Sequence, residues 1–387
     1  MNISYSFFYI KLLFVITFFC KISFGQNIEN SKDDIILAEK LSKIYPDEKV
    51  VSLEYIVNIS FENITSGVGR FPVAAIMKTD NKLISLKDAV YYTGVFYYDK
   101  QSDIINISAT NLKGKKDESF SYSNQKVESD GIFYDDEMVC IYNTSFSSKG
   151  KTLILHANKN FYDVKYLTSF FFHDNFPILK YTLVINVPEW LDMEIVEKNF
   201  SDYIIYKNIE KNEKLKCKKY TYKLENLSAR KQEKNTPHPS KNLPHIIFLS
   251  KYYINKAGQK NNLFASINDL YSWYYKLIPK DSTHSAELKT LVKVLTKDTI
   301  DDLQKIKSIY YWVQDNIRYI AFENGIMGFK PENPNKVYQN RYGDCKGMAS
   351  LLKQLLVIAG YDARLTWLGT KRLAYDYSIP SLIVDNH

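Results

Sequence analysis

Histidine and cysteine are scarce in this sequence, and the few that occur form no metal-binding pattern. The chain has six histidines and four cysteines among its 387 residues. No two histidines are three or four residues apart, and the cysteines lie too far apart for a zinc motif. The sequence therefore predicts a protein that binds no metal ion.

Glycine and proline are also few, at 14 and 11 residues, whereas tyrosine and phenylalanine are abundant, at 31 and 22. Aromatic residues favour strands, and 45% hydrophobic residues indicate a packed globular protein rather than a disordered one. A chain of this length suits two domains. No basic stripe interleaved with aromatic residues accompanies the net charge of +8, so we predict no nucleic-acid partner.

Long apolar runs are absent except near the N-terminus. A short apolar run at residues 12–19 follows a lysine, and Ser23-Phe24-Gly25 supplies small residues before a predicted cleavage site at Gln26. The run is too short to span a bilayer permanently, and bulky phenylalanines before Cys20 disfavour a lipoprotein signal. We therefore expect residues 1–25 to be a signal peptide. The mature protein would then be exported, periplasmic or secreted, without a transmembrane segment.

Removal of this segment would leave three cysteines, Cys140, Cys217 and Cys345. An odd number of cysteines in an oxidising compartment leaves two alternatives. Either Cys140 and Cys217 form a disulfide and Cys345 stays free, or all three thiols are reduced.

The middle of the chain has the pattern of strands. Apolar and polar residues alternate at 151–156 and 180–187, and short polar turns separate many such runs between residues 50 and 225. Short strands between polar turns predict an antiparallel β-sandwich. A polar stretch with three prolines at 228–245 precedes the last predicted strand, which places a domain boundary near 255–265.

Beyond this boundary, hydrophobic residues recur at the three- and four-residue spacing of helices. Helices are predicted at 269–277, at 301–319 and, most strongly, at 345–359, with an irregular loop at 320–342. Residues 363–368 then have the pattern of a strand.

A cysteine, Cys345, lies at the start of the strongest predicted helix. Asp344 can cap this helix and Gly360 can end it. The helix dipole and the unpaired N–H groups at a helix N-terminus favour a thiolate, which is the reactive form of cysteine. His387, in the following region, could supply a base. One helix face carries the predicted core residues Met348, Leu351, Leu352, Leu355 and Leu356.

Several motifs carry a resemblance to a known family. They are residues 310–319, residues 325–331, Tyr342-Gly343-Asp344-Cys345-Lys346 and Asp385-Asn386-His387. Together they resemble the bacterial transglutaminase-like superfamily. Upstream, residues 171–178 (FFHDNFPI) resemble a domain of unknown function that commonly precedes such cores in exported bacterial proteins.

The resemblance implies an α+β protein in two parts after the signal peptide. Residues 26–260 would be the β-rich N-terminal domain, and residues 265–387 a papain-like core of helices packed on an antiparallel sheet. Cys345 would be the nucleophile and His387 its partner, with no cofactor. Asp344, Gly343 and Tyr342 would support the site.

The implied reaction is acyl transfer or hydrolysis at a peptide or isopeptide amide of a peptide or protein substrate, such as one of the cell envelope. In the family an Asp that orients the histidine lies on the strand after it, and nothing follows His387 in this sequence. We therefore expect this form to be weakly active or inactive, and the core to be incomplete at its C-terminal end. The alternative function is that of a non-catalytic scaffold that binds a peptide or glycan.

Overall fold

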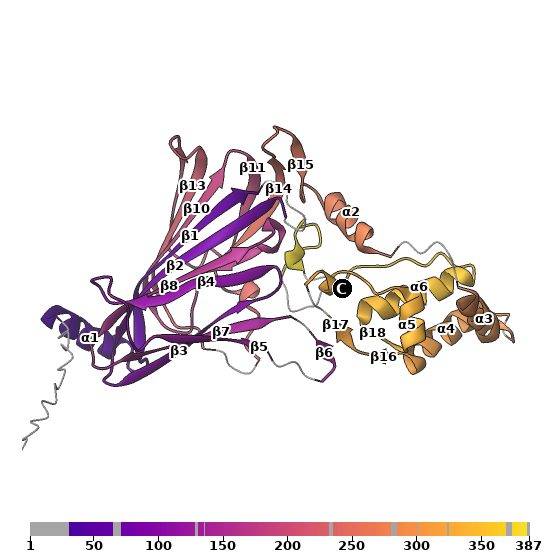
Figure 1. Ribbon diagram of the computed structural model, residues 1–387, viewed down its shortest axis with the longest axis horizontal. Coiled ribbons are helices and arrows are strands. Elements are labelled where there is room, and N and C mark those ends of the chain that lie inside the picture. Colours follow the sequence, from indigo (N-terminus) through magenta and orange to yellow (C-terminus); the bar gives the residue numbers. More distant parts are fainter. Residues whose placement is uncertain are drawn as a thin grey trace, which may run out of the picture.

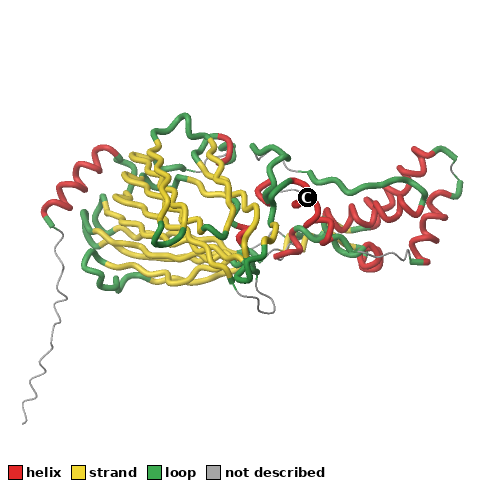
Figure 2. Tube along the Cα trace, turned by 90° about the horizontal axis from the view of Figure 1, so that it is seen from above, coloured by secondary structure: helices red, strands yellow, loops and turns green. Residues whose placement is uncertain are grey.

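The computed structural model describes residues 31–64, 71–127, 131–134, 136–231, 235–279, 285–298, 300–322, 325–368 and 374–384. A strand-rich part extends to about residue 262 and a helical part follows it (Figures 1 and 2). The predicted signal peptide lies outside the described residues. No described helix is both long enough and apolar enough to cross a membrane.

A broad, curved sheet of seven strands dominates the strand-rich part (Figure 1). Its order is β12-β13-β10-β1-β2-β8-β4. All neighbours are antiparallel, as predicted, except the central pair β1 and β10, which is parallel. No hairpin connects those two strands, so no tight turn imposes the antiparallel direction. The strands are β1 (Val50–Asn63), β2 (Val73–Ser85), β4 (Ser102–Thr110), β8 (Thr152–Phe161), β10 (Ile178–Pro188), β12 (Ile205–Asn212) and β13 (Cys217–Leu227).

Two smaller sheets pack on the same face of the broad sheet. One has the order β3-β7-β5, and the other contains β11, β14 and β15, with β9 also paired to β14. Buried side chains of the broad sheet form the main core with β14 at one end and a second cluster with β7 at the other. The strands are β3 (Val90–Tyr98), β5 (Ser121–Lys126), β7 (Met138–Phe146), β9 (Ser169–Phe171), β11 (Leu191–Lys198), β14 (His245–Ile254) and β15 (Lys260–Asn262). The 3-10 turns η1 (Val164–Tyr166) and η2 (Pro239–Lys241) lie between them.

The opposite face of the broad sheet is covered at one end by helix α1 (Lys32–Ile44). Ala38 and Leu41 of α1 pack against Ile84, whereas the adjacent Leu83 belongs to the main core. Successive side chains of a strand point to opposite faces, so α1 and the smaller sheets lie on different sides.

A cluster of tyrosines surrounds the half-buried carboxyl group of Asp174 beside the main core. The Tyr55 and Tyr181 rings stack with their centroids 4.8 Å apart. Burial raises the pKa of Asp174 to about 6, although a hydrogen bond from the Asn175 N–H at 2.7 Å opposes this shift. At neutral pH the folded protein therefore holds a poorly solvated carboxylate.

Replacing Asp174 with asparagine is expected to stabilise the fold in a pH-dependent way. The carboxyl pKa is higher in the folded state than its ordinary value of 3.8, so the wild-type free energy of unfolding falls as pH rises from about 4 to 6. Asp174→Asn should raise that free energy by about 1–3 kcal/mol at pH 7 and leave it nearly unchanged at pH 4. Urea unfolding at both pH values measures this, with the exposed Asp315→Asn as control. An equal effect at both pH values would contradict the assignment.

The helical part contains the three helices expected from the sequence and two that were not expected. The predictions at 269–277, 301–319 and 345–359 are confirmed by α2 (Ile267–Leu277), α4 (Asp302–Asn316) and α6 (Cys345–Ile358). Helix α3 (Ala286–Thr296) was not predicted. Helix α5 (Pro334–Asn340) and the 3-10 turn η3 (Gly325–Gly328) occupy much of the predicted loop at 320–342. Another 3-10 turn, η4 (Leu382–Val384), lies near the end of the described chain.

The sheet expected for a papain-like core is not present in the part of the helical region that the structure describes. Exposure alternates along residues 363–368, but no described segment pairs with them, so the predicted strand is wrong. An extended segment becomes a strand only when a neighbour accepts and donates its backbone hydrogen bonds. Among the described residues of this region, pairing is confined to two-residue strands, β16 (Arg318–Tyr319) with β18 (Tyr342–Gly343) and β17 (Ala321–Phe322) with β6 (Phe133–Tyr134).

The end of the described chain, like the pairing of β17 with β6, joins the two parts (Figure 1). Leu382 packs with Phe264 and Leu270 in a cluster that also contacts Tyr166 of η1. The Tyr375 hydroxyl lies 3.0 Å from Nε2 of His245, a fully buried residue of β14. Nδ1 of His245 lies 2.8 Å from the Leu243 carbonyl oxygen and must donate to it, so Nε2 accepts from Tyr375. This segment thus fixes the helical part on the strand-rich part.

Candidate active site at the N-terminus of helix α6

Cys345 is the first residue of α6, as predicted, and its side chain is half-buried. It is a free thiol, and so are Cys140 and Cys217, which are 1% and 3% exposed. The latter two lie on different sheets, on β7 and β13, so the disulfide alternative is not present. Cys345 is the most accessible of the three thiols.

Asp344 precedes the thiol and uses both carboxylate oxygens to fix the helix start. Oδ1 accepts a hydrogen bond of 2.7 Å from the Gly347 N–H, which confirms the predicted N-cap. Oδ2 lies 2.7 Å from Nζ of Lys346. Both residues are buried, at 7% and 3% exposure. Asp344 is therefore a structural group, and its oxygens are not available as a base for Cys345.

Gly343 and Tyr342 position the backbone that enters the helix. They form β18, whose neighbour is β16, and the Ile320 N–H donates to the Gly343 carbonyl oxygen at 3.1 Å. Gly343 is buried, and a Cβ atom built on it would lie 3.0 Å from Cγ1 of Val337 on α5. The glycine thus permits α5 to approach the turn before Cys345. The Tyr342 side chain is 38% exposed at the same turn.

Two aromatic residues from outside the motif border the site. The rings of Tyr274 on α2 and Trp367 lie 4.4 Å apart between centroids. Burial raises the pKa of Tyr274, and its closeness to Cys345 and Asp344 raises it further. Tyr274 therefore stays a neutral phenol next to the thiol. The sequence predicted the helix that carries Tyr274 but gave no sign that this tyrosine borders the site.

The predicted base, His387, lies outside the described residues together with Asp385 and Asn386. The described histidines are engaged elsewhere or buried in the strand-rich part. His156 contacts Asp80, His245 contacts Tyr375, and burial lowers the pKa of His173 to about 4. Of the predicted site residues, Cys345, Asp344, Gly343 and Tyr342 are thus brought together. Among the described residues, no group of three or more His, Cys, Asp or Glu side chains could hold a metal ion.

Helix α6, which carries the site, packs on a small hydrophobic core. Shortening a side chain of that core is expected to lower the free energy of unfolding. Leu351 is fully buried among side chains of α3, α4 and α5, whereas Leu352 is only half-buried. Leu351→Ala should lower the free energy of unfolding by about 2–5 kcal/mol and Leu352→Ala by less. Urea denaturation tests the order, with Val357→Ala, at an exposed position of the same helix, as control. Equal losses at 351 and 352 would contradict this packing.

Comparison with known proteins agrees with this description of the helical part. Residues 289–372, from α3 to beyond α6, match the sequence model of the Transglutaminase-like superfamily. The match includes Cys345 and does not extend to residues 26–260, so their resemblance to a domain of unknown function stays a prediction. No curated protein matches the sequence. The chain thus contains a transglutaminase-like segment.

One solved structure shows a similar overall fold. A candidate protease from Parabacteroides distasonis is 13% identical to this chain, with a TM-score of 0.56. The similarity covers 88% of this chain and 64% of the other, so this chain spans less than two thirds of that protein. A candidate nutrient-binding protein from Legionella pneumophila is 11% identical with a TM-score of 0.32, covering 81% and 94% of the two chains. The first similarity defines a mixed α+β protein composed mostly of strands.

Proposed function

We propose that the protein is an exported thiol enzyme of the transglutaminase or protease type, which acts on peptide or isopeptide amides through Cys345. The observation that carries the proposal is a half-buried, unpaired thiol at the first position of a helix whose start is fixed by a buried ion pair. The match of residues 289–372 supports the class. His387 is proposed as the base from its sequence motif.

In the proposed reaction the Cys345 sulfur attacks the amide carbonyl carbon and forms a tetrahedral intermediate. Its oxyanion would be held by the backbone N–H of Cys345, because a helix leaves its first N–H groups without intrahelical partners. The C–N bond then breaks, and the amine leaves with a proton from the imidazolium of His387. Attack of water on the thioester gives an acid, attack of a second amine gives a new amide, and both regenerate the thiol.

Three products distinguish the possible reactions, and one set of incubations measures them all. Casein is incubated with the protein and a fluorescent primary amine. Incorporation of the amine indicates transfer, new N-termini indicate proteolysis, and ammonia indicates deamidation. We expect at least one product. None of the three, together with a thiol that reacts no faster than free cysteine, would favour the non-catalytic scaffold.

Export is proposed from residues 1–25 and has its own measurement. Intact-mass analysis of periplasmic or secreted material should give a chain that begins at Gln26. A full-length chain confined to the cytoplasm would contradict the proposal.

A further inference from the structure

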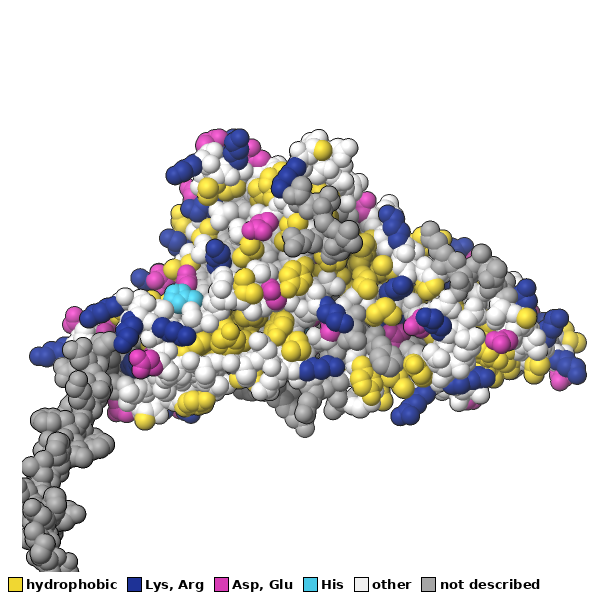
Figure 3. All heavy atoms as spheres, viewed as in Figure 1, with side chains coloured by type: hydrophobic (Ala, Val, Ile, Leu, Met, Phe, Trp, Pro, Cys, Tyr) yellow, Lys and Arg dark blue, Asp and Glu magenta, His cyan; other side chains and the backbone are white. Residues whose placement is uncertain are grey.

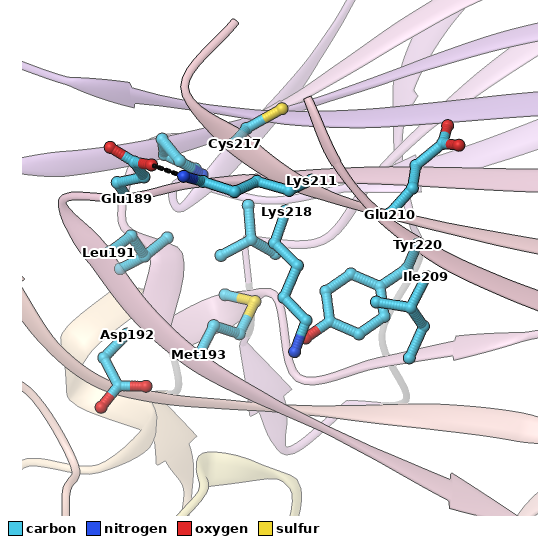
Figure 4. Close-up of a pocket in the computed structure, with 12 residues that line it drawn as sticks. Glu189, Leu191, Asp192, Met193, Ile209, Glu210, Lys211, Cys217, Lys218 and Tyr220 are labelled. Carbon is cyan, nitrogen blue, oxygen red and sulfur yellow. Dashed lines mark ion pairs between the residues drawn. The ribbon is translucent and has the colours of Figure 1, made fainter. Parts of the chain in front are cut away.

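A cavity of about 490 Å³ lies in the strand-rich part, at the end of the broad sheet where β10 turns into β11 (Figure 4). This volume is in the range of ligand-binding pockets. Its floor is apolar and consists of buried side chains at most 8% exposed. These side chains are Val187, Leu191, Met193, Cys217 and Tyr220.

The charged side chains around the cavity leave one ammonium group without a carboxylate. Lys211 is paired with Glu189 at 3.6 Å and with Glu213 at 2.9 Å. Glu210 is paired with Lys219 at 2.9 Å. Lys218 lies over the Tyr220 ring, 5.0 Å from its centroid, and no described carboxylate is within ion-pair distance of its Nζ.

The position of Lys218 makes it a receptor for an anionic group inside the cavity. In Figure 4 its side chain extends toward the Tyr220 ring, over which its ammonium lies. Asp192, the other lining carboxylate, points away from Lys218 in the same view. A ligand with one carboxylate and one apolar group would therefore pair with the Lys218 ammonium and fill the apolar floor of the cavity.

Two strand edges border the same cavity. Among the described residues β12 pairs only with β13, and β11 pairs only with β14. Ile209 of β12 and Met193 of β11 both line the cavity. The free edge of a strand offers backbone N–H and C=O groups to an extended peptide, which a simple fatty acid could not use.

We propose that this cavity binds the carboxyl terminus of an extended peptide. The terminal carboxylate pairs with Lys218, the last side chain, which is apolar, enters the floor, and the preceding backbone lies along a free strand edge. The site involves neither Cys345 nor the helical part. It would bind a peptide whether or not the proposed reaction occurs.

Binding is measured on the full chain carrying Cys345→Ala, so that the peptide stays intact. The probe is a fluorescein-labelled peptide that ends in Val-Leu with a free carboxylate, and fluorescence polarisation gives its affinity. We expect saturable binding that weakens about tenfold when the carboxylate is replaced by an amide and about tenfold in Lys218→Gln. Lys218 is exposed, so this change should leave the fold intact, which urea unfolding verifies.

Lys223→Gln is the matched control. Lys223 lies on the same strand and over a tyrosine ring, 5.7 Å from the Tyr206 centroid, but it does not line this cavity. The affinity of the Lys223→Gln variant for the peptide should equal that of the protein that carries Cys345→Ala alone. Equal binding of acid and amide, equal effects of the two lysine variants, or no saturable binding would overturn the proposal. Displacement of the peptide by sodium oleate that itself binds more tightly would overturn the choice of a peptide as ligand.

Discussion

Replacing Cys345 with alanine is expected to abolish the weak turnover of a peptide amide that the sequence predicts, a loss on the order of 10²-fold. Loss of the nucleophile removes the acyl-enzyme route altogether, and residual rates in such variants arise only from binding and oxyanion stabilisation. The measurement is product formation per enzyme in the casein incubation. Because Cys345 lies at the helix start and outside the main core, the variant should unfold at nearly the same urea concentration as the wild type.

Thiol alkylation separates this chemical role from a structural one. Cys140 and Cys217 are buried, and burial raises the pKa of both thiols, so iodoacetamide should modify them slowly in the folded protein. Cys345 should be modified at least about tenfold faster. Peptide mass mapping after short exposure at pH 7 measures all three, and Cys217→Ala is the matched control. Turnover that survives in Cys345→Ala, or preferential labelling of Cys140, would contradict the proposed nucleophile.

The start of α6 was predictable because its signals are local. Asp344, the apolar periodicity and Gly360 all lie within the length of one helix in the sequence. The structure confirms Asp344 as the N-cap. It also confirms that the helix ends before Gly360, which has a φ of 96°. The strands between residues 50 and 225 were predictable for the same reason. Alternation and polar turns are local features.

Features that depend on distant partners were not predictable from this one sequence. The parallel pairing of β1 with β10 joins segments separated by the intervening strands. The alternation at 363–368 resembles that of any strand, but a strand also needs a neighbour that a local pattern cannot reveal. Tyr274 borders the site only because α2 lies close to Cys345 and Asp344, which are far from it in the sequence.

One face of the molecule shows how its charged side chains are distributed. In the face shown in Figure 3, Lys and Arg side chains are scattered among acidic ones and do not gather into one patch. Many of the described lysines are paired with a nearby carboxylate, such as Lys251 with Glu194 at 2.8 Å and Lys231 with Glu48 at 3.0 Å. This distribution agrees with the absence of a basic stripe in the sequence.

Replacing Lys346 with methionine is expected to lower the free energy of unfolding by about 3–5 kcal/mol, although methionine fits an apolar environment better. The reason is that the Asp344 carboxylate, 8% exposed, would lose the ammonium 2.7 Å away. A single buried charge without its partner is far more costly than the intact pair is stabilising. Urea unfolding gives the free energy, and Lys353→Met, a half-buried lysine on the same helix, is the control.

A double-mutant cycle distinguishes this electrostatic cause from lost packing. Asparagine at 344 can still cap the helix but carries no charge, so Lys346→Met should cost much less in the Asp344→Asn background. The same variants connect stability to the site, because the ion pair lies on both sides of Cys345 in the sequence. If loss of the ion pair disorders the start of the helix, the rate at which iodoacetamide labels Cys345 should change in Lys346→Met. That rate should return toward the wild-type value in the double variant. Equal costs of Lys346→Met in both backgrounds would show that the lysine acts through its aliphatic chain and not through its charge.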